Sequence, residues 1–512
     1  MPDALTWLPW LPPLCYLAGA FLTSVLGRHP WQRCAVATRG ALLAAALACA
    51  GVLGAGHGGA RAAAGLVELL VAFLGWIIGD FSQRHLRGES GQRRFVLAFL
   101  MTLAAVDAVV ASENLALLIG AWAASSAGLH QLLTFYRDRP AAHIVAHKKF
   151  LVSRMAEACL LAAAVLLYRE WGTLEIPRIA ALAAASPALP LAASAAALLI
   201  ALAVLLKCAQ LPLHGWLIQV MEAPTPVSAL LHAGVVNLGG FVLIRFAPLL
   251  AASPAARSLL VACGLASALL AGMVSLTRVS IKVRLAWSTV AQMGFMVLEC
   301  GLGLYVLAAL HLLGHSLYKA HAFLSASSAV REGKLRALRD AAHNSAASVL
   351  AAPFLAAGIL VLLDHALGAA PWPWWWTGVL AAAWAPLLWW PAWSGARAGV
   401  AAWRVLAGVA LVAALGLAAL LAHRLELGTR DLPWAGAGPL ALAGMACLYA
   451  ALAALQLAPG RLETLRRWSY AGFYVDEIYT RAALRLWPAR WGGPARTGAA
   501  ARRRTQVHWS IS

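Results

Sequence analysis

The fold of this chain follows from one stretch, Lys207-Cys-Ala-Gln-Leu-Pro212-Leu-His-Gly-Trp-Leu217. An apolar run, residues 195–206, precedes it and is typical of a buried helix. Because proline cannot continue the hydrogen bonding of a helix, Pro212 predicts an interruption near Lys207. A lysine at such a break inside a membrane can hold water and exchange a proton. The structural alternative is a lysine whose amino group reaches the membrane surface from a helix end.

The composition of the whole chain is that of a membrane protein. Of its 512 residues, 62% are hydrophobic and only 12% are charged, whereas soluble domains carry about 25% charged residues. Apolar runs of about 18 residues or more can cross a bilayer. Such runs lie near 4–26, 36–56, 64–81, 95–112, 114–136, 150–168, 190–221, 226–249, 257–276, 283–303, 304–328, 346–368, 374–396, 401–424 and 436–458. The sequence therefore predicts an all-α polytopic membrane protein with about 15 transmembrane helices.

The positive charge, +20 in total, is concentrated in alternate connections. Its carriers are Arg28, Arg33 and Arg39; Arg84, Arg87, Arg93 and Arg94; Arg137, Arg139, Lys148 and Lys149; Arg278, Lys282 and Arg284; and Arg331, Lys334, Arg336 and Arg339. Because cytoplasmic loops carry the excess of Lys and Arg, we expect these connections on the cytoplasmic side of the membrane and the N-terminus on the outside. Residues 459–512, which are too polar to span, are expected to form an interfacial helix and a cytoplasmic tail. No long basic tract with interleaved aromatics points to nucleic acid.

No cofactor motif is present in the sequence. The 8 Cys form no CxxC pair, which argues against an iron–sulfur cluster or a structural zinc site. There is no GxGxxG after a strand and no GxxxxGKS loop for a nucleotide. We therefore expect no cofactor, no metal and no catalytic centre in this chain.

A second polar candidate is His232, which follows Pro224-Thr-Pro226. Prolines are tolerated where a helix begins, so His232 is expected about two turns inside the next helix. Its ordinary pKa range suits proton transfer. A single hydrogen-bonded core histidine is the alternative.

The third candidate group is His311, His315 and Lys319. Their spacing of i, i+4 and i+8 places them on one face of a helix, where they could pass a proton. Two histidines at i and i+4 can also share zinc, but a lysine as third member would repel the ion. A structural polar network is the other alternative.

Two carboxylates are deep enough to pair with Lys207. Asp107 lies within a predicted span, and Glu157 lies early in another. Either could bias the protonation of the lysine. Glu113 and Glu222 are expected to lie at helix ends near the membrane surface.

The motifs around these residues resemble those of the antiporter-like membrane subunits of proton-pumping NADH:quinone oxidoreductase and multisubunit cation antiporters. Lys207–Leu217 followed by Glu222–His232 resembles the first signature, Ser280–Arg284 the second, and the helix of His311 the third. The resemblance implies two inverted five-helix repeats with broken helices, over 95–249 and 250–396. They would lie between N-terminal helices, 1–94, and C-terminal helices, 397–458. It also implies a polar axis and a proton or sodium path with Lys207 as a switch. The residues of that axis would be Lys207, His232, His311, His315 and Lys319.

The chain departs from the pumping pattern after Trp122. The family places a Glu there to pair with the lysine, whereas this chain has Ala123-Ala-Ser-Ser126. His130, two turns further on, is a candidate for a polar role in its place.

This departure resembles the DabB family, the membrane subunits of inorganic-carbon accumulation complexes. Shared motifs are Phe135–Pro140, Lys148–Arg154 and Gly472-Phe-Tyr-Val-Asp-Glu-Ile-Tyr-Thr480. The resemblance implies a multi-pass protein of the inner membrane of a bacterium. It also implies a large peripheral cytoplasmic partner, DabA-like, with zinc in a carbonic-anhydrase-like site that makes bicarbonate from carbon dioxide. The alternatives are a pumping subunit of an NADH dehydrogenase, membrane hydrogenase or cation antiporter, and a passive scaffold. A scaffold gains nothing from a charge in mid-membrane.

Overall fold

The computed structural model describes residues 7–26, 29–54, 60–326, 344–368, 372–390, 398–424 and 430–486. Within these ranges every named element is a helix. Twelve of these helices are long and apolar enough to cross a membrane. The prediction of an all-α polytopic membrane protein is confirmed. Lys334 and the other basic residues predicted between 331 and 339 lie outside the described residues, as does the tail after Leu486.

The helices fall into consecutive groups along the chain. The N-terminal group is η1 (Leu8–Trp10), α2 (Leu11–Leu26), α3 (Pro30–Gly54) and α4 (Ala60–His85). The next group is α5 (Gln92–Ala111), α6 (Leu115–Leu133), α7 (Pro140–Trp171), α8 (Ile176–Ala185), α9 (Leu191–Lys207), α10 (Gly215–Ile218), η2 (Val220–Glu222), α11 (Thr225–Ala233), η3 (Val235–Asn237), α12 (Leu238–Arg245) and α13 (Ala247–Ala251). Then follow α14 (Pro254–Thr277), α15 (Ile281–Leu302), α16 (Tyr305–Leu324), α18 (Ala346–Leu367), α19 (Trp374–Trp384), η4 (Ala385–Leu388), α20 (Ala398–Arg424) and α21 (Gly438–Leu457). The C-terminal elements are η5 (Pro459–Leu462), α22 (Glu463–Tyr470), η6 (Gly472–Tyr474) and α23 (Val475–Leu486).

Each predicted apolar run contains a helix, but α9, α16 and α19 are not among the twelve full spans. The helix α9 has 17 residues because it stops at the predicted break. The helix α19 has only 11 residues and passes into the 3-10 turn η4. The prediction of about 15 crossings therefore includes helices that are short or polar for a span.

The break near Lys207 is present as the sequence predicts. The helix α9 ends at Lys207, and residues 208–214 separate it from α10. A second interruption, at Gly234, separates α11 from α12. No proline lies there, and the sequence analysis did not predict this interruption. In the second predicted repeat, α18 runs unbroken through Pro353.

The predicted position of Lys148 and Lys149 in a loop is wrong. We expected both in a cytoplasmic connection, but α7 already begins at Pro140 and includes them. Lys148 is 0% exposed and Lys149 is 4% exposed. They are therefore buried groups that need partners, and not loop charges.

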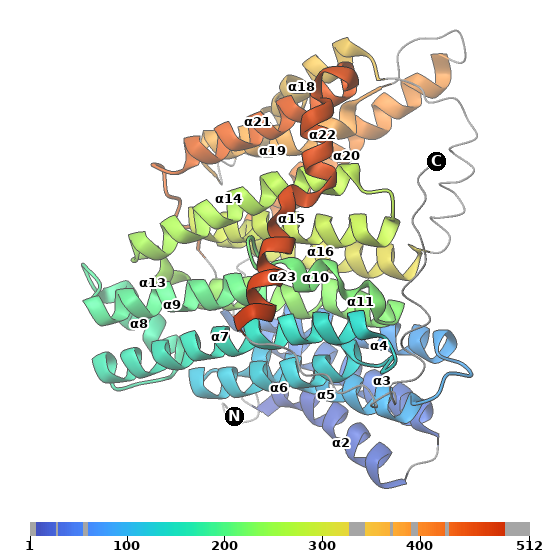
Figure 1. Cartoon of the computed structure of the whole chain (residues 1–512). Coiled ribbons are helices and arrows are strands. Elements are labelled where there is room, and N and C mark those ends of the chain that lie inside the picture. The colour runs from blue at the N-terminus through green and yellow to red at the C-terminus, as the bar shows by residue number, and fades with distance from the viewer. Residues whose placement is uncertain are drawn as a thin grey trace.

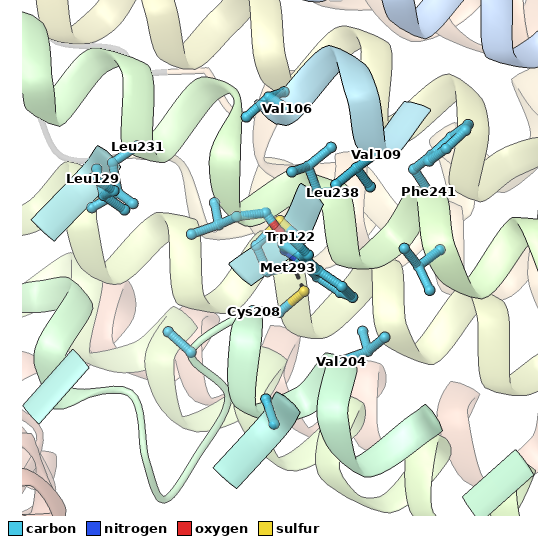
Figure 2. Packing of buried hydrophobic residues seen from close by; sticks show 14 of the residues in the cluster. Val106, Val109, Trp122, Leu129, Val204, Cys208, Leu231, Leu238, Phe241 and Met293 are labelled. Carbon is cyan, nitrogen blue, oxygen red and sulfur yellow. Dashed lines mark hydrogen bonds between the residues drawn. The ribbon is translucent and has the colours of Figure 1, made fainter. Parts of the chain in front are cut away.

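The helices α2–α6 lie towards one end of the bundle, α18–α21 lie at the other, and α7–α16 lie between them (Figure 1). Helices distant in sequence also meet, as α4 does with α11 and α16. The C-terminal elements α22 and α23, drawn in red, cross the bundle and contact α14, α10 and α7. Figure 2 shows the largest apolar cluster, which includes Trp122, Cys208 and Met293 from helices distant in sequence.

Candidate functional site

Lys207 lies at the end of α9 and makes three polar or charged contacts. Its Nζ donates to Glu157 Oε1 on α7 at 3.1 Å and to Ser126 Oγ on α6 at 3.0 Å. The ammonium also lies 5.3 Å from the centroid of the Trp122 ring. The lysine side chain is 6% exposed, so this is a buried ion pair. Glu157 thus forms an ion pair with the lysine, as the family pattern expects of a Glu after Trp122.

Glu157 is shared between two cations. Arg154 approaches the same carboxylate at 2.8 Å from one turn away on α7. Lys149 Nζ donates to the Ser126 carbonyl at 2.5 Å, beside the hydroxyl that binds Lys207. One carboxylate therefore serves a group with three cationic side chains. Adding one proton to such a group, or removing one, changes its net charge.

His232 lies inside α11 and is fully buried. Its Nδ1 is 3.1 Å from Thr289 Oγ1 on α15, and its ring stacks on Phe323 with centroids 4.5 Å apart. Its Nε2 has no protein partner. This geometry fits both a core histidine held by one hydrogen bond and a histidine that can exchange a proton.

The residues His311, His315 and Lys319 lie along α16 as their spacing predicts. His311 joins Glu299 Oε2 at 2.9 Å through Nδ1 and Gln292 Oε1 at 2.9 Å through Nε2. The rings of His311 and His315 have centroids 6.0 Å apart.

The inner part of this row is buried. Both ring nitrogens of His315 lack a protein partner, and the residue is 7% exposed. Lys319 Nζ donates to the Leu285 carbonyl at 2.9 Å and to the Ser288 hydroxyl. The sequence analysis missed Glu299, which adds a buried carboxylate at the His311 end.

Asp107 lies away from Lys207, whereas His130 lies beside Lys149, a neighbour of Lys207. The Asp107 carboxylate has no hydrogen-bond partner and interacts electrostatically with Glu68 and Tyr16, away from Lys207. His130 lies near Phe150 and within electrostatic range of Lys149. Of the two carboxylates weighed as the partner of Lys207, the structure brings only Glu157 to it.

The C-terminal segment forms a second buried ion pair that the sequence analysis did not anticipate. Lys148 Nζ lies 2.7 Å from Asp476 Oδ1 on α23 and 2.7 Å from Thr480 Oγ1. Gln219, after α10, donates to the other Asp476 oxygen at 2.5 Å. Tyr479 OH donates to the Lys148 carbonyl at 3.1 Å. Burial, and then the Asp476 charge, raise the pKa of Tyr479, so this phenol stays a donor.

Gly215 allows that approach. A Cβ at this position would lie 1.3 Å from Asp476 Oδ1, so any other residue would displace the carboxylate. The start of α10 is thus held from one side by α23. The motif Gly472–Thr480 indicated that the C-terminal segment matters, but it did not identify Lys148 and Gly215 as the residues that face Asp476.

The described residues contain no group of three or more His, Cys, Asp or Glu side chains that could hold a metal ion. His311 and His315 could not share zinc in this arrangement, because both ring nitrogens of His311 already face oxygen atoms.

Comparisons with known proteins agree with this architecture. The family model described as NADH:quinone oxidoreductase/Mrp antiporter, TM, matches residues 112–385. A probable inorganic carbon transporter subunit DabB of Hydrogenovibrio crunogenus is 41% identical over 433 residues, which are 82% of this chain and 82% of that protein. A probable inorganic carbon transporter subunit DabB2 of Halothiobacillus neapolitanus is 52% identical over 259 residues, which cover 51% of this chain and 47% of that protein.

Solved structures of membrane complexes are similar over most of the chain. A chain of the Mrp complex from Dietzia sp. DQ12-45-1b superposes with a TM-score of 0.55 at 21% identity, covering 94% of this chain and 55% of that one. At this identity the likeness establishes the fold and nothing more.

Proposed function

The chain belongs to the NADH:quinone oxidoreductase and Mrp antiporter family of membrane subunits, and within it to the DabB subunits; from this premise we propose that it conducts protons or sodium ions to drive inorganic carbon uptake. The ion gradient would energise a large peripheral cytoplasmic subunit, DabA-like and zinc-containing. That partner would hydrate carbon dioxide to bicarbonate and release a proton. The chain itself would supply the path and the coupling, without catalysis of its own.

The observation that carries this proposal is the ion pair of Lys207 and Glu157 at the break of α9. Ionisable groups buried in membrane helices are costly, and they mark ion paths far more often than passive anchors. An ion that reaches Glu157 competes with Lys207 for the carboxylate. The lysine then keeps its hydrogen bond to Ser126 and is free to move away from Glu157, because a broken helix end has room to move.

From His232 onward, the proposed path follows groups that lie within electrostatic range of one another. His232 interacts with Lys319, and His315 interacts with Lys319, His311 and His232. Glu299 completes the row beyond His311. We assign the order Lys207, His232, Lys319, His315 and His311, with His130 and Lys149 beside its Lys207 end.

The test is carbon accumulation by cells that depend on the intact complex. Lys207→Ala is expected to abolish accumulation without reducing the amount of complex in the membrane. The matched control is Lys282→Ala, since Lys282 is a half-buried lysine that donates to Thr225 Oγ1 away from this row. Full accumulation by a well-expressed Lys207→Ala protein would remove the switch role from that lysine.

Affinity purification separates the rival functions. One large soluble zinc-containing protein that co-purifies supports the carbon proposal. Several membrane paralogues, or flavin and iron–sulfur subunits, would instead make this a pumping subunit. A complex that assembles with its partner but carries no ion flux would be a scaffold.

A further inference from the structure

A cavity of about 590 Å³ opens between η1, the starts of α4, α6 and α8, and the ends of α3, α5 and α12. It lies at the opposite end of these helices from the connection with Arg84 and Arg87, so the charge rule puts it on the outside. Its polar lining consists of Glu68, Glu113, Asn114, Glu175 and Arg245. None of these residues belongs to the row that begins at Lys207.

One carboxyl group lies in the wall of this cavity, and a second interacts with it from behind the wall. Glu68 lines it, is 2% exposed, and its Oε1 has no hydrogen-bond partner. Asp107 is 0% exposed, and neither of its oxygens has a partner. The two groups interact electrostatically with each other, and the Tyr16 hydroxyl beside them is also without a partner.

No described cationic side chain neutralises this pair. Arg245 on α12 is in the cavity wall, but its guanidinium donates to the carbonyls of Val110 at 3.2 Å and Ser112 at 2.9 Å. The remaining titratable neighbours are the thiols of Cys15, Cys34 and Cys49. Two adjacent carboxyl groups removed from water cannot both carry a charge.

We propose that Glu68 and Asp107 form a proton-exchange site, which binds a proton from the outside through this cavity. Two carboxyl groups and a phenol offer too few oxygens for a hard metal cation, which takes about six or more. A proton needs only one of them. The cavity supplies water at Glu68, and Asp107 lies one turn deeper than Val110 and Ala111 of the cavity wall. This site is separate from the path of the proposed function and does not depend on it.

Infrared spectroscopy of the full chain in lipid nanodiscs tests the site. At neutral pH we expect a carbonyl band of a protonated carboxyl group, and we expect Asp107→Asn or Glu68→Gln to remove or weaken it. Transfer to D2O should shift the band, because the cavity gives water access to the pair. The matched control is Glu299→Gln, which removes a different buried acid and should leave this band in place.

A cavity-filling variant tests the route. Ala64 lines the cavity on α4, and Ala64→Leu should slow the shift in D2O while the band itself remains. Absence of a band that either carboxyl variant removes would overturn the proposal. So would a band that does not shift in D2O, or one whose shift is as fast in Ala64→Leu as in the natural chain. None of these outcomes bears on carbon accumulation by Lys207 variants.

Discussion

The ion pair between Lys148 and Asp476 predicts that one substitution releases the C-terminal segment. Asp476→Ala would leave the Lys148 ammonium without a counter-ion at a position where its side chain is 0% exposed. Breaking a buried pair in this way costs about 3–5 kcal/mol. The Asp476 side chain is 12% exposed, and Thr480 and Gln219 still bind the ammonium. We therefore use the lower end, about 3 kcal/mol.

Proteolysis measures this loss. The exposed residues Arg466, Arg467, Arg481 and Arg485 are trypsin sites on α22 and α23. When the segment opens and closes quickly, cleavage follows the population of the open form. A loss of about 3 kcal/mol should therefore make cleavage roughly 100-fold faster. The transmembrane helices should stay intact, because most of their contacts are with one another.

Two controls decide whether the buried pair is the cause. Glu463→Ala removes an exposed pair with Arg467, whose side chains are 64% and 76% exposed, and should change cleavage little. Lys148→Met combined with Asp476→Leu removes both charges and should restore much of the protection. The reasoning is refuted if Asp476→Ala is cleaved no faster than Glu463→Ala, or if the double variant is as sensitive as Asp476→Ala.

Three further predictions concern neighbouring contacts. Gly215→Ala should release α23 as Asp476→Ala does, because the new Cβ would overlap the Asp476 carboxylate although every charge remains. The same cleavage assay detects the release, and unchanged protection would contradict the close contact between Gly215 and Asp476. Glu157→Gln should lower the melting temperature of the purified chain and abolish ion flux, because Lys207 and Arg154 lose their shared counter-ion; unaltered flux in reconstituted complexes would remove Glu157 from the path. Phe323→Leu should lower the free energy of unfolding by about 0.5–1.5 kcal/mol beyond the effect of the lost apolar area, because His232 stacks on that ring. Chemical denaturation of the two proteins measures the difference.

Local chemistry made the helix break predictable. Pro212 stops a helix by its own covalent structure, so the end of α9 at Lys207 could be placed from sequence. The row along α16 was predictable because helix geometry alone aligns residues four apart. The interruption at Gly234 carries no comparable local signal.

Contacts between helices could not be placed in the same way. Asp107 and Glu157 looked equivalent as partners of Lys207, since both are acidic residues within apolar runs. Only the packing of α7 against α9 decides for Glu157. The partner of Lys148 lies 328 residues further along the chain, and no local pattern links the two. The apolar run that begins at 150 predicts a loop at Lys148. The helix α7 begins ten residues earlier, at Pro140, and so includes this lysine.

The helix α7 joins the two buried ion pairs. Glu157 binds Lys207 at one end of the break in α9, and Lys148, nine residues earlier, binds Asp476 beside Gly215 at the other end. Nine residues of helix span about 13 Å, so one element contacts both sides of the break. If the proposed peripheral partner binds α23, it would act on Lys207 through α7 without entering the membrane.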